Sequence, residues 1–257
     1  YMTAKIISWN INSIRARLEH LNHLLSNESP DILLLQETKV MDEQFPASFI
    51  DYFNYNYVIN GQKSYNGVSV FSKHPIELIT KNIPGTNPNE ARFLLCHTNN
   101  LTVGNVYIPN GVEVGAPQYY YKLEFINKLT DLINEYKNNE FVLCGDFNVT
   151  FDDYDVYNPK TWHEKNTCST LERNAIKEFI NDNTMIDSFR YVNQDYQNKY
   201  TWWNYRAFGY QNNYGLRIDY ALTSVKLKEK IVKSSILKQY REMEKPSDHA
   251  PLELLLS

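Results

Sequence analysis

The sequence predicts an α/β domain with more strands than helices. Short runs rich in Val, Ile, Tyr and Phe recur along the chain and are bounded by Gly, Asn or Pro, which is typical of β-strands. Segments with helical periodicity lie between some of these runs. No Gly-, Pro- or Ser-rich linker divides the 257 residues, so we expect one domain over residues 1–257.

The expected strands are spread over the whole chain. They are Lys5–Trp9, Ile32–Leu35, Tyr55–Ile59, Val68–Phe71, Phe93–His97, Leu101–Tyr107, Phe141–Cys144, Ile218–Leu222 and Leu252–Leu256. Stretches with loop-like composition lie among them, as functional loops do on a rigid scaffold. These loops are Pro84–Glu90, Pro109–Pro117, Asp152–Thr167 and Asn204–Gly215.

Three segments have the spacing of amphipathic helices, namely Leu18–Leu25, Tyr120–Tyr136 and Leu171–Ile180. Ser169 and Glu172 have the spacing of a capping box at the start of the third segment. We expect the two histidines of the first helix, His20 and His23, to lie on the surface.

The composition limits the class of protein. Hydrophobic residues make up 42% and charged residues 22%, so the chain has enough apolar side chains for a core. The net charge of −4 argues against a protein that coats nucleic acid non-specifically, although an enzyme with a local basic rim stays compatible with it.

The number of cysteines and the length of the apolar runs indicate in which cellular compartment the protein lies. Cys96, Cys144 and Cys168 are an odd, scattered set without CxxC spacing, which favours a reducing environment over disulfides or a zinc site. We expect Cys144 to be core packing. No apolar run is long enough for a signal peptide or a membrane span. We therefore expect a soluble cytoplasmic protein, near the nucleoid in a bacterium or in the nucleus of a eukaryote.

Polar side chains follow several of the predicted strands, at the point where each strand ends. Phe141–Cys144 runs into Gly145 and then Asp146, although an uncompensated buried carboxylate is costly. Asn10, Glu37 and Tyr107 likewise lie at strand ends. Other polar side chains adjoin apolar strands in a different way, since Asp219 lies inside one and Asp248 and His249 come just before the last. The ends of a sheet would gather these residues in one place.

Each of these residues has a simpler interpretation when it is taken alone. An Asn or Asp at a strand end is usually a turn or cap residue, and a single His is more often structural than catalytic. Together, however, acids in one cleft repel one another unless a cation or a proton compensates them. Carboxylates and amides without a Cys–His cluster indicate Mg²⁺, or Mn²⁺ in its place, and not zinc.

The alternation of side chains in extended backbone indicates which carboxylate pairs with His249. Asp248 and His249 are neighbours and cannot both face one partner, whereas Asp146 and Asn148 can. His249 therefore needs a carboxylate from elsewhere, and Asp219 is the candidate. Such a pair would orient the imidazole and raise its pKa.

Seven motifs occur in the order of one known family. They are NINSIRAR at 10–17, LLQETKV at 34–40, YNGVSVFSK at 65–73, NVYIPNG at 105–111, GDFNVT at 145–150, GLRIDY at 215–220 and KPSDHAPLE at 245–253. The chain thereby resembles the exonuclease III family of abasic-site DNA endonucleases, within the endonuclease/exonuclease/phosphatase superfamily. The resemblance implies a DNase I-like four-layered sandwich, in which helices flank two packed mixed β-sheets.

The resemblance also implies roles for the polar residues. Glu37 would be the main ligand of Mg²⁺, with Asn10 beside it and Asp248 supporting the metal region. Asp146 would orient or deprotonate the attacking water, and Asn148 would hold it. Tyr107 and His249, paired with Asp219, would contact the scissile phosphate. Which of Asp146, His249 and Tyr107 is the general base stays open.

The segment 201–220 is aromatic and basic and lies next to Asp219. By resemblance, Trp202, Leu216 and Ile218 would line a pocket for the extruded abasic sugar, although Trp202 or Trp203 alone could equally be core. Lys39 and Arg173, with Arg15 and Lys63, are candidates for phosphate contacts.

The expected function is a Mg²⁺-dependent DNA-repair phosphodiesterase. It would cut double-stranded DNA on the 5′ side of abasic sites to leave a 3′-hydroxyl, with 3′→5′ exonuclease and 3′-end-trimming activity on blocked ends, as a monomer without membrane contact. Two alternatives stay open. One is a phosphoesterase of the same superfamily that acts on a phosphoinositide, a lipid or RNA, and the other is an inactive nucleic-acid-binding relative.

Overall fold

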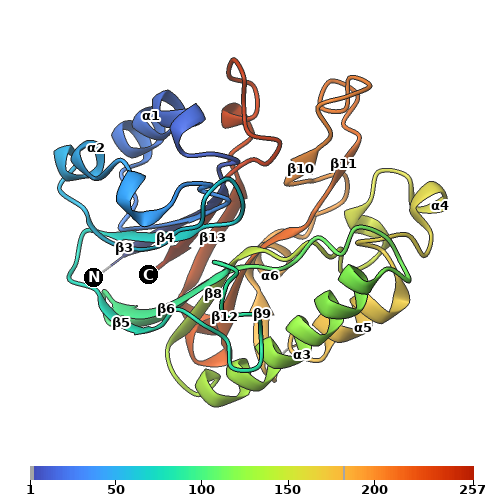
Figure 1. Cartoon of the computed structure of the whole chain (residues 1–257). Helices are drawn as coiled ribbons and strands as arrows, with labels where there is room; N and C mark the ends of the chain where they lie inside the picture. The colour runs from blue at the N-terminus through green and yellow to red at the C-terminus, as the bar shows by residue number, and fades with distance from the viewer. Residues whose placement is uncertain (1–2, 182) are drawn as a thin grey trace.

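Two six-stranded mixed sheets pack against each other, and helices cover their outer faces (Figure 1). The structure is a computed structural model, and it describes residues 3–181 and 183–257. The four layers are α1 and α2, the first sheet, the second sheet, and then α3 and α5. This confirms the α/β sandwich that the sequence predicts.

The first sheet has the strand order β13-β14-β1-β2-β4-β3. Its central strands β1 and β2 run parallel, and the other pairs are antiparallel. The strands are β1 (Ala4–Asn10), β2 (Ile32–Gln36), β3 (Asn56–Asn60), β4 (Val68–Ser72), β13 (Ile231–Ile236) and β14 (Leu252–Leu256).

The second sheet has the strand order β5-β6-β7-β8-β12-β9, with β7 and β8 parallel. Its strands are β5 (Glu77–Thr80), β6 (Phe93–Thr98), β7 (Leu101–Tyr107), β8 (Phe141–Asp146), β9 (Met185–Asp187) and β12 (Asp219–Ser224). A separate two-stranded ribbon, β10 (Trp202–Trp203) and β11 (Gly215–Leu216), lies beyond the end of β12 (Figure 1).

The helices confirm the three predicted segments and add short ones. The α-helices are α1 (Leu18–Glu28), α2 (Ala47–Tyr52), α3 (Pro117–Tyr136), α4 (Pro159–Trp162), α5 (Thr170–Lys177) and α6 (Ser188–Val192). The 3₁₀ turns are η1 (Arg15–Arg17), η2 (Asp42–Gln44), η3 (Asp153–Asp155), η4 (Val225–Lys230) and η5 (Lys238–Tyr240). The sequence did not predict α2, α4, α6 or the strands β5, β9, β10, β11 and β13.

Side-chain alternation explains how a strand such as ILLLQ can be buried on both faces. Ile32 and Leu34 of β2 pack between the two sheets, whereas Leu33 and Leu35 pack under α1 and α2. Cys144 of β8 belongs to the core between the sheets, as predicted. None of the three cysteines forms a disulfide in the described part of the chain.

The start of α5 contains the predicted cap. Ser169 Oγ accepts a hydrogen bond from the Glu172 main-chain N–H at 3.3 Å, and Glu172 Oε1 accepts one from Ser169 Oγ at 2.7 Å. Glu172 also accepts from the main-chain N–H of Thr167, so this cap fixes the loop that precedes the helix.

Two expectations need correction. His20 is buried, because Nε2 of its ring lies 2.8 Å from the main-chain oxygen of Glu244, where a long loop folds over α1; His23 is exposed as predicted. The loop Asp152–Thr167 contains η3 and α4. Within the described residues, no helix has both the length and the apolar composition needed to cross a membrane.

The register of the strands places the polar strand ends in rows. Tyr107 lies opposite Asp146 in the β7–β8 pair, and Asp146 lies opposite Asp219 in the β8–β12 pair. In the first sheet Asn10 pairs with Gln36, so that Glu37 follows directly. One end of each sheet therefore carries a row of polar side chains.

Candidate active site

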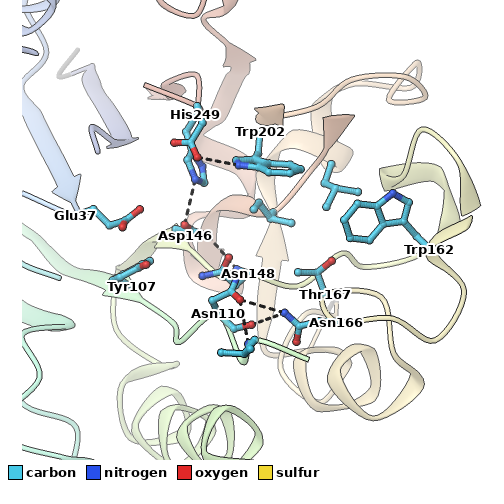
Figure 2. Close-up of a pocket in the computed structure, with 14 residues that line it drawn as sticks. Glu37, Tyr107, Asn110, Asp146, Asn148, Trp162, Asn166, Thr167, Trp202 and His249 are labelled. Atoms are coloured by element: carbon cyan, nitrogen blue, oxygen red, sulfur yellow. Dashed lines mark hydrogen bonds and ion pairs between the residues drawn. The ribbon is translucent and has the colours of Figure 1, made fainter. Parts of the chain in front are cut away.

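A cavity of about 490 Å³ lies where these two rows meet. Figure 2 shows Glu37 entering from the first sheet and Tyr107 and Asp146 from the second, with His249 above them. Ligand atoms of Glu37, Asp146 and His249 all lie within 4.8 Å of one another, so this group could hold a metal ion. The gathering of strand ends that the sequence predicts is thus confirmed.

Glycine 145 determines how Asp146 reaches the cavity. Gly145 has φ of 152°, and a Cβ at this position would lie 1.8 Å from the main-chain oxygen of Val106. Only glycine allows β7 and β8 to approach this closely, and the following residue then enters the site. This accounts for the glycine in the GDFN motif.

Asp146 is buried and lacks a cationic Lys or Arg partner among the described residues. Its oxygens accept hydrogen bonds from Asn10 Nδ2 at 2.9 Å and from the Asn148 main-chain N–H at 3.0 Å. Burial raises the pKa of Asp146 to about 8, and the nearby Asp219 and Glu37 carboxylates act in the same direction, against the lowering effect of His249.

His249 pairs with Asp219, as the sequence predicts. The ring Nδ1 lies 2.8 Å from Asp219 Oδ2, and the ring Nε2 lies 3.5 Å from Asp146 Oδ2. Burial alone would lower the pKa of His249, but Asp219 and Asp146 raise it well above its usual value. His249 is therefore an imidazolium donor in this arrangement, which suits contact with an anion better than ligation of a metal.

Glu37 and Tyr107 form the other side of the cavity. Glu37 Oε2 accepts from Asn10 Nδ2 at 2.6 Å, and Lys39 Nζ lies 3.6 Å from Glu37 Oε1. Burial and the carboxylates of Glu37 and Asp146 raise the pKa of Tyr107 well above its usual value, although Arg92 stacks over its ring at 5.0 Å. Tyr107 therefore stays a phenol, which can donate a hydrogen bond.

The amide of Asn10 joins the two carboxylates. Asn10 Oδ1 accepts from the main-chain N–H of Asn12 at 3.1 Å, so the side-chain N–H groups face Glu37 and Asp146. This orientation holds the carboxylates together but does not present an oxygen to a metal.

Asp248 points away from His249, as expected for neighbours in an extended segment. It accepts from Trp202 Nε1 at 3.1 Å and lies 3.4 Å from Asn12 Nδ2, at the edge of the cavity. The indole of Trp202 is thereby held in place as one wall of the cavity (Figure 2).

The three residues of the predicted pocket come together. Trp202 pairs with Leu216 across β10 and β11, and Ile218 lies just before β12. All three line the cavity and belong to one apolar cluster, which Trp162 joins from α4. This apolar compartment opens beside the acidic group.

The basic residues lie at the periphery. Lys39 Nζ donates to Asn12 Oδ1 at 2.7 Å, next to Glu37. Arg173 is outside the residues that line the cavity, and its guanidinium donates to Thr150 Oγ1 and Asp153. Arg15 is exposed, with Nη1 3.5 Å from Gln44 Oε1, and Lys63 is exposed.

Several residues that shape the cavity escaped the sequence analysis. They are Asn110, which lies in the NVYIPNG motif but was given no role, Trp162 at the end of α4, and Val112, Asn166 and Thr167, which lie in loops without a motif. A fully buried lysine, Lys122, supports these loops: it donates to the main-chain oxygens of Asn110 and Asn148 and forms an ion pair with Glu172. The position of Lys122 on a helix gave no sequence signal for this role.

Comparison with known proteins agrees with the fold and the site. Residues 7–249 match the Endonuclease/Exonuclease/phosphatase family. The chain belongs to this family. It is 35% identical to exodeoxyribonuclease III of Haemophilus influenzae, over 96% of this chain and 98% of that protein. The exonuclease III resemblance is therefore confirmed, and the chain is a hydrolase of phosphoesters.

Two solved structures of family members are also similar. A 3′ phosphatase from Neisseria, bound to a product DNA hairpin, superposes with a TM-score of 0.92 and 34% identity, over 99% of both chains. An AP endonuclease from Archaeoglobus fulgidus superposes with a TM-score of 0.94 and 30% identity, over 99% of both chains.

Proposed function

We propose that this chain is a Mg²⁺-dependent DNA-repair phosphodiesterase that cuts on the 5′ side of abasic sites and leaves a 3′-hydroxyl. It also removes 3′-terminal nucleotides and 3′-blocking groups. The observation that carries this proposal is the direct connection between the acidic group at Asp146 and the apolar compartment at Trp202 in one cavity. The relatives named as exodeoxyribonuclease III, AP endonuclease and 3′ phosphatase support it.

Glu37 and Asp146 would hold the divalent cation. Their carboxylates are hard oxygen donors, which suit Mg²⁺ or Mn²⁺. Burial is the main cause of the raised pKa of Asp146, and a cation would offset the further effect of the Asp219 and Glu37 carboxylates. When bound, the ion would stabilise negative charge on the scissile phosphate. Asn10 would orient both carboxylates, and the ligand roles predicted for Asn10 and Asp248 stay predictions.

Asp146 is the residue best placed to act on the attacking water. It lines the cavity, and its pKa, raised to about 8, lies close to neutrality, which suits a general base, whereas Tyr107 stays protonated and His249 stays charged. Asn148 would hold the water through Oδ1, because its Nδ2 donates to the main-chain oxygen of Ile108 at 2.8 Å.

His249 and Tyr107 would bind the scissile phosphate from two sides. The Asp219 carboxylate fixes the imidazolium, so its Nε2 proton points into the cavity, and the Tyr107 hydroxyl donates from β7. Preorganised donors of this kind stabilise the charge that develops on the phosphoryl oxygens in the transition state.

Trp202, Leu216 and Ile218 would select the substrate by exclusion. A nucleotide without a base costs little to unstack and can enter a closely walled apolar compartment, whereas a normal base is excluded by its size. The substrate would be double-stranded DNA, bound by a monomer in the cytoplasm.

The test is incubation of a labelled duplex that carries one abasic site, with Mg²⁺ or with EDTA, followed by mapping of the product termini. We expect a single cut that leaves a 3′-hydroxyl, only with Mg²⁺. A matched duplex with a 3′-phosphate measures end trimming. Cleavage of a phosphoinositide or RNA in place of DNA, or DNA binding with EDTA and no cleavage with Mg²⁺, would contradict the proposal.

A further inference from the structure

Thr167 has an unusual backbone conformation for its residue type. Among the described residues, Thr167, with φ of 76°, and Val112, with φ of 62°, are the β-branched residues in the left-handed region. Both line the cavity. A β-branched residue with positive φ is an outlier that costs free energy, and such outliers cluster at functional sites.

The main chain of Thr167 is fixed from both sides. Its N–H donates to the Glu172 carboxylate at 3.0 Å, and its oxygen accepts from the Thr150 N–H at 2.8 Å and from Thr150 Oγ1 at 2.9 Å. These contacts involve only the backbone of Thr167, and glycine could make them without strain. The threonine side chain therefore needs an explanation of its own.

The side chain of Thr167 extends into the cavity. Residue 167 is only 6% exposed, and Figure 2 shows its hydroxyl turned toward the space between Trp202 and Trp162. The recorded polar contact of Oγ1 is with Cys168 Sγ at 3.5 Å, and sulfur is a weak hydrogen-bond partner. A hydroxyl with only this weak hydrogen-bond partner thus faces the apolar walls of the compartment that would receive the sugar.

A buried threonine hydroxyl without a partner is not by itself a site. Thr223 Oγ1 is buried and has no hydrogen-bond partner at all, but it lies in β12, opposite Val142, and outside the cavity lining. Thr167 differs in its strained backbone and in its position in the cavity. Together these features indicate that a ligand group completes the bonding of the hydroxyl.

We propose that Thr167 Oγ1 forms a hydrogen bond with the C1′ hydroxyl of the abasic deoxyribose. This inference rests on the proposed function. Loss of a base by hydrolysis leaves a hydroxyl at C1′, the atom that enters a base-excluding compartment. The Thr167 hydroxyl can donate to this group or accept from it, so Thr167 determines specificity for an intact abasic sugar over a ring that lacks the hydroxyl.

The test compares two duplexes, one with a natural abasic site and one with a tetrahydrofuran analogue that has hydrogen in place of the C1′ hydroxyl. The readout is the ratio of kcat/KM for the natural site to kcat/KM for the analogue. We expect Thr167→Val to lower this ratio by about fivefold, which corresponds to one neutral hydrogen bond. Thr167→Ser keeps a hydroxyl and should retain the wild-type ratio.

Thr223→Val is the matched control, since it removes a buried hydroxyl outside the cavity and should leave the ratio unchanged. Melting temperatures verify that each variant is folded. An unchanged ratio in Thr167→Val overturns the inference, as does an equal fall in Thr167→Ser or Thr223→Val. If the wild-type enzyme cuts neither duplex, the proposed function fails instead.

Discussion

Two groups of buried and partly buried acidic residues differ in their neighbours. In the first, which we call the arginine network, Arg190 and Arg217 bind Asp152, Asp155 and Asp187. Arg217 Nε lies 2.7 Å from Asp155 Oδ1, and its Nη2 lies 2.7 Å from Asp187 Oδ2. Every carboxylate of this network has a guanidinium partner.

The second group consists of Glu37, Asp146 and Asp219, and in the part of the chain that the structure describes it forms ion pairs only with His249 and Lys39. Burial without full compensation raises the pKa of Asp146. In the arginine network, by contrast, Arg190 lowers the pKa of Asp152 despite the opposing effect of burial. The same residue type is therefore paired with arginines in one place and, in the other, belongs to a group that could hold a cation.

The largest expected effect is the loss of turnover in Asp146→Asn. We expect kcat on the abasic duplex to fall by roughly 10²- to 10⁴-fold, because the acceptor for the proton of water is removed. The melting temperature should not fall, since an uncompensated carboxylate disappears. Asp131→Asn, on the exposed face of α3, is the control. A kcat near the wild-type value would remove Asp146 from the mechanism.

Breaking the arginine network should instead destabilise the fold. We expect Arg217→Met to lower the free energy of unfolding by about 3–5 kcal/mol, because Asp187 is left buried without a guanidinium and Asp155 keeps only the contact with Arg190. Urea denaturation measures this loss. Arg15→Met changes an exposed arginine and should cost less than about 0.5 kcal/mol. Equal losses in both variants would show that the network does not contribute to stability.

The two groups of acidic residues should also differ in how stability depends on pH. The folded-state pKa of Asp152 is depressed, so its contribution is present above the unfolded pKa of about 4 and is lost as the pH falls through the folded pKa. We therefore expect Asp152→Asn to lower the melting temperature at neutral pH and to have a shrinking effect in acid. A difference that stays constant from neutral to acidic pH would contradict this assignment.

The smallest effect concerns strain at the rim of the cavity. Val112 has φ of 62° and is 62% exposed, so Val112→Gly removes strain and little packing. We expect the free energy of unfolding to rise by about 0.5–1 kcal/mol, after the higher chain entropy of glycine is taken into account. Val225→Gly, in an exposed turn without positive φ, should be destabilising. A loss of stability in Val112→Gly would show that no strain is stored there.

Much of the fold was predictable because its signals are local. Strand bounds such as Leu101–Tyr107 agree with the apolar runs, and α5 begins where the Ser169–Glu172 spacing predicts. The strand β13 was not predicted, because its sequence IVKSSI mixes polar and apolar residues without a clear period. His20 was assigned to the surface because helical periodicity does not show which distant loop covers a helix face.

The residues of the site that lie beside strand ends could be predicted from the sequence, because the ends of strands in a sheet lie close together. Asp219 and His249 were paired correctly, since alternation in extended backbone excluded Asp248 as the partner. Thr167, Val112 and Lys122 were not found, because loop geometry and a buried ion pair depend on contacts between segments far apart in the chain.

The sequence by itself determined, through periodicity, the strands and helices and the polar side chains beside them. The order of its motifs determined the family, and the resemblance to that family implied the layers of the sandwich. Only the tertiary structure decided which carboxylates receive an arginine and which stay uncompensated beside a cavity. The reason is that burial, desolvation and left-handed backbone are imposed by neighbours that are distant in the chain, and a linear pattern contains no information about these neighbours.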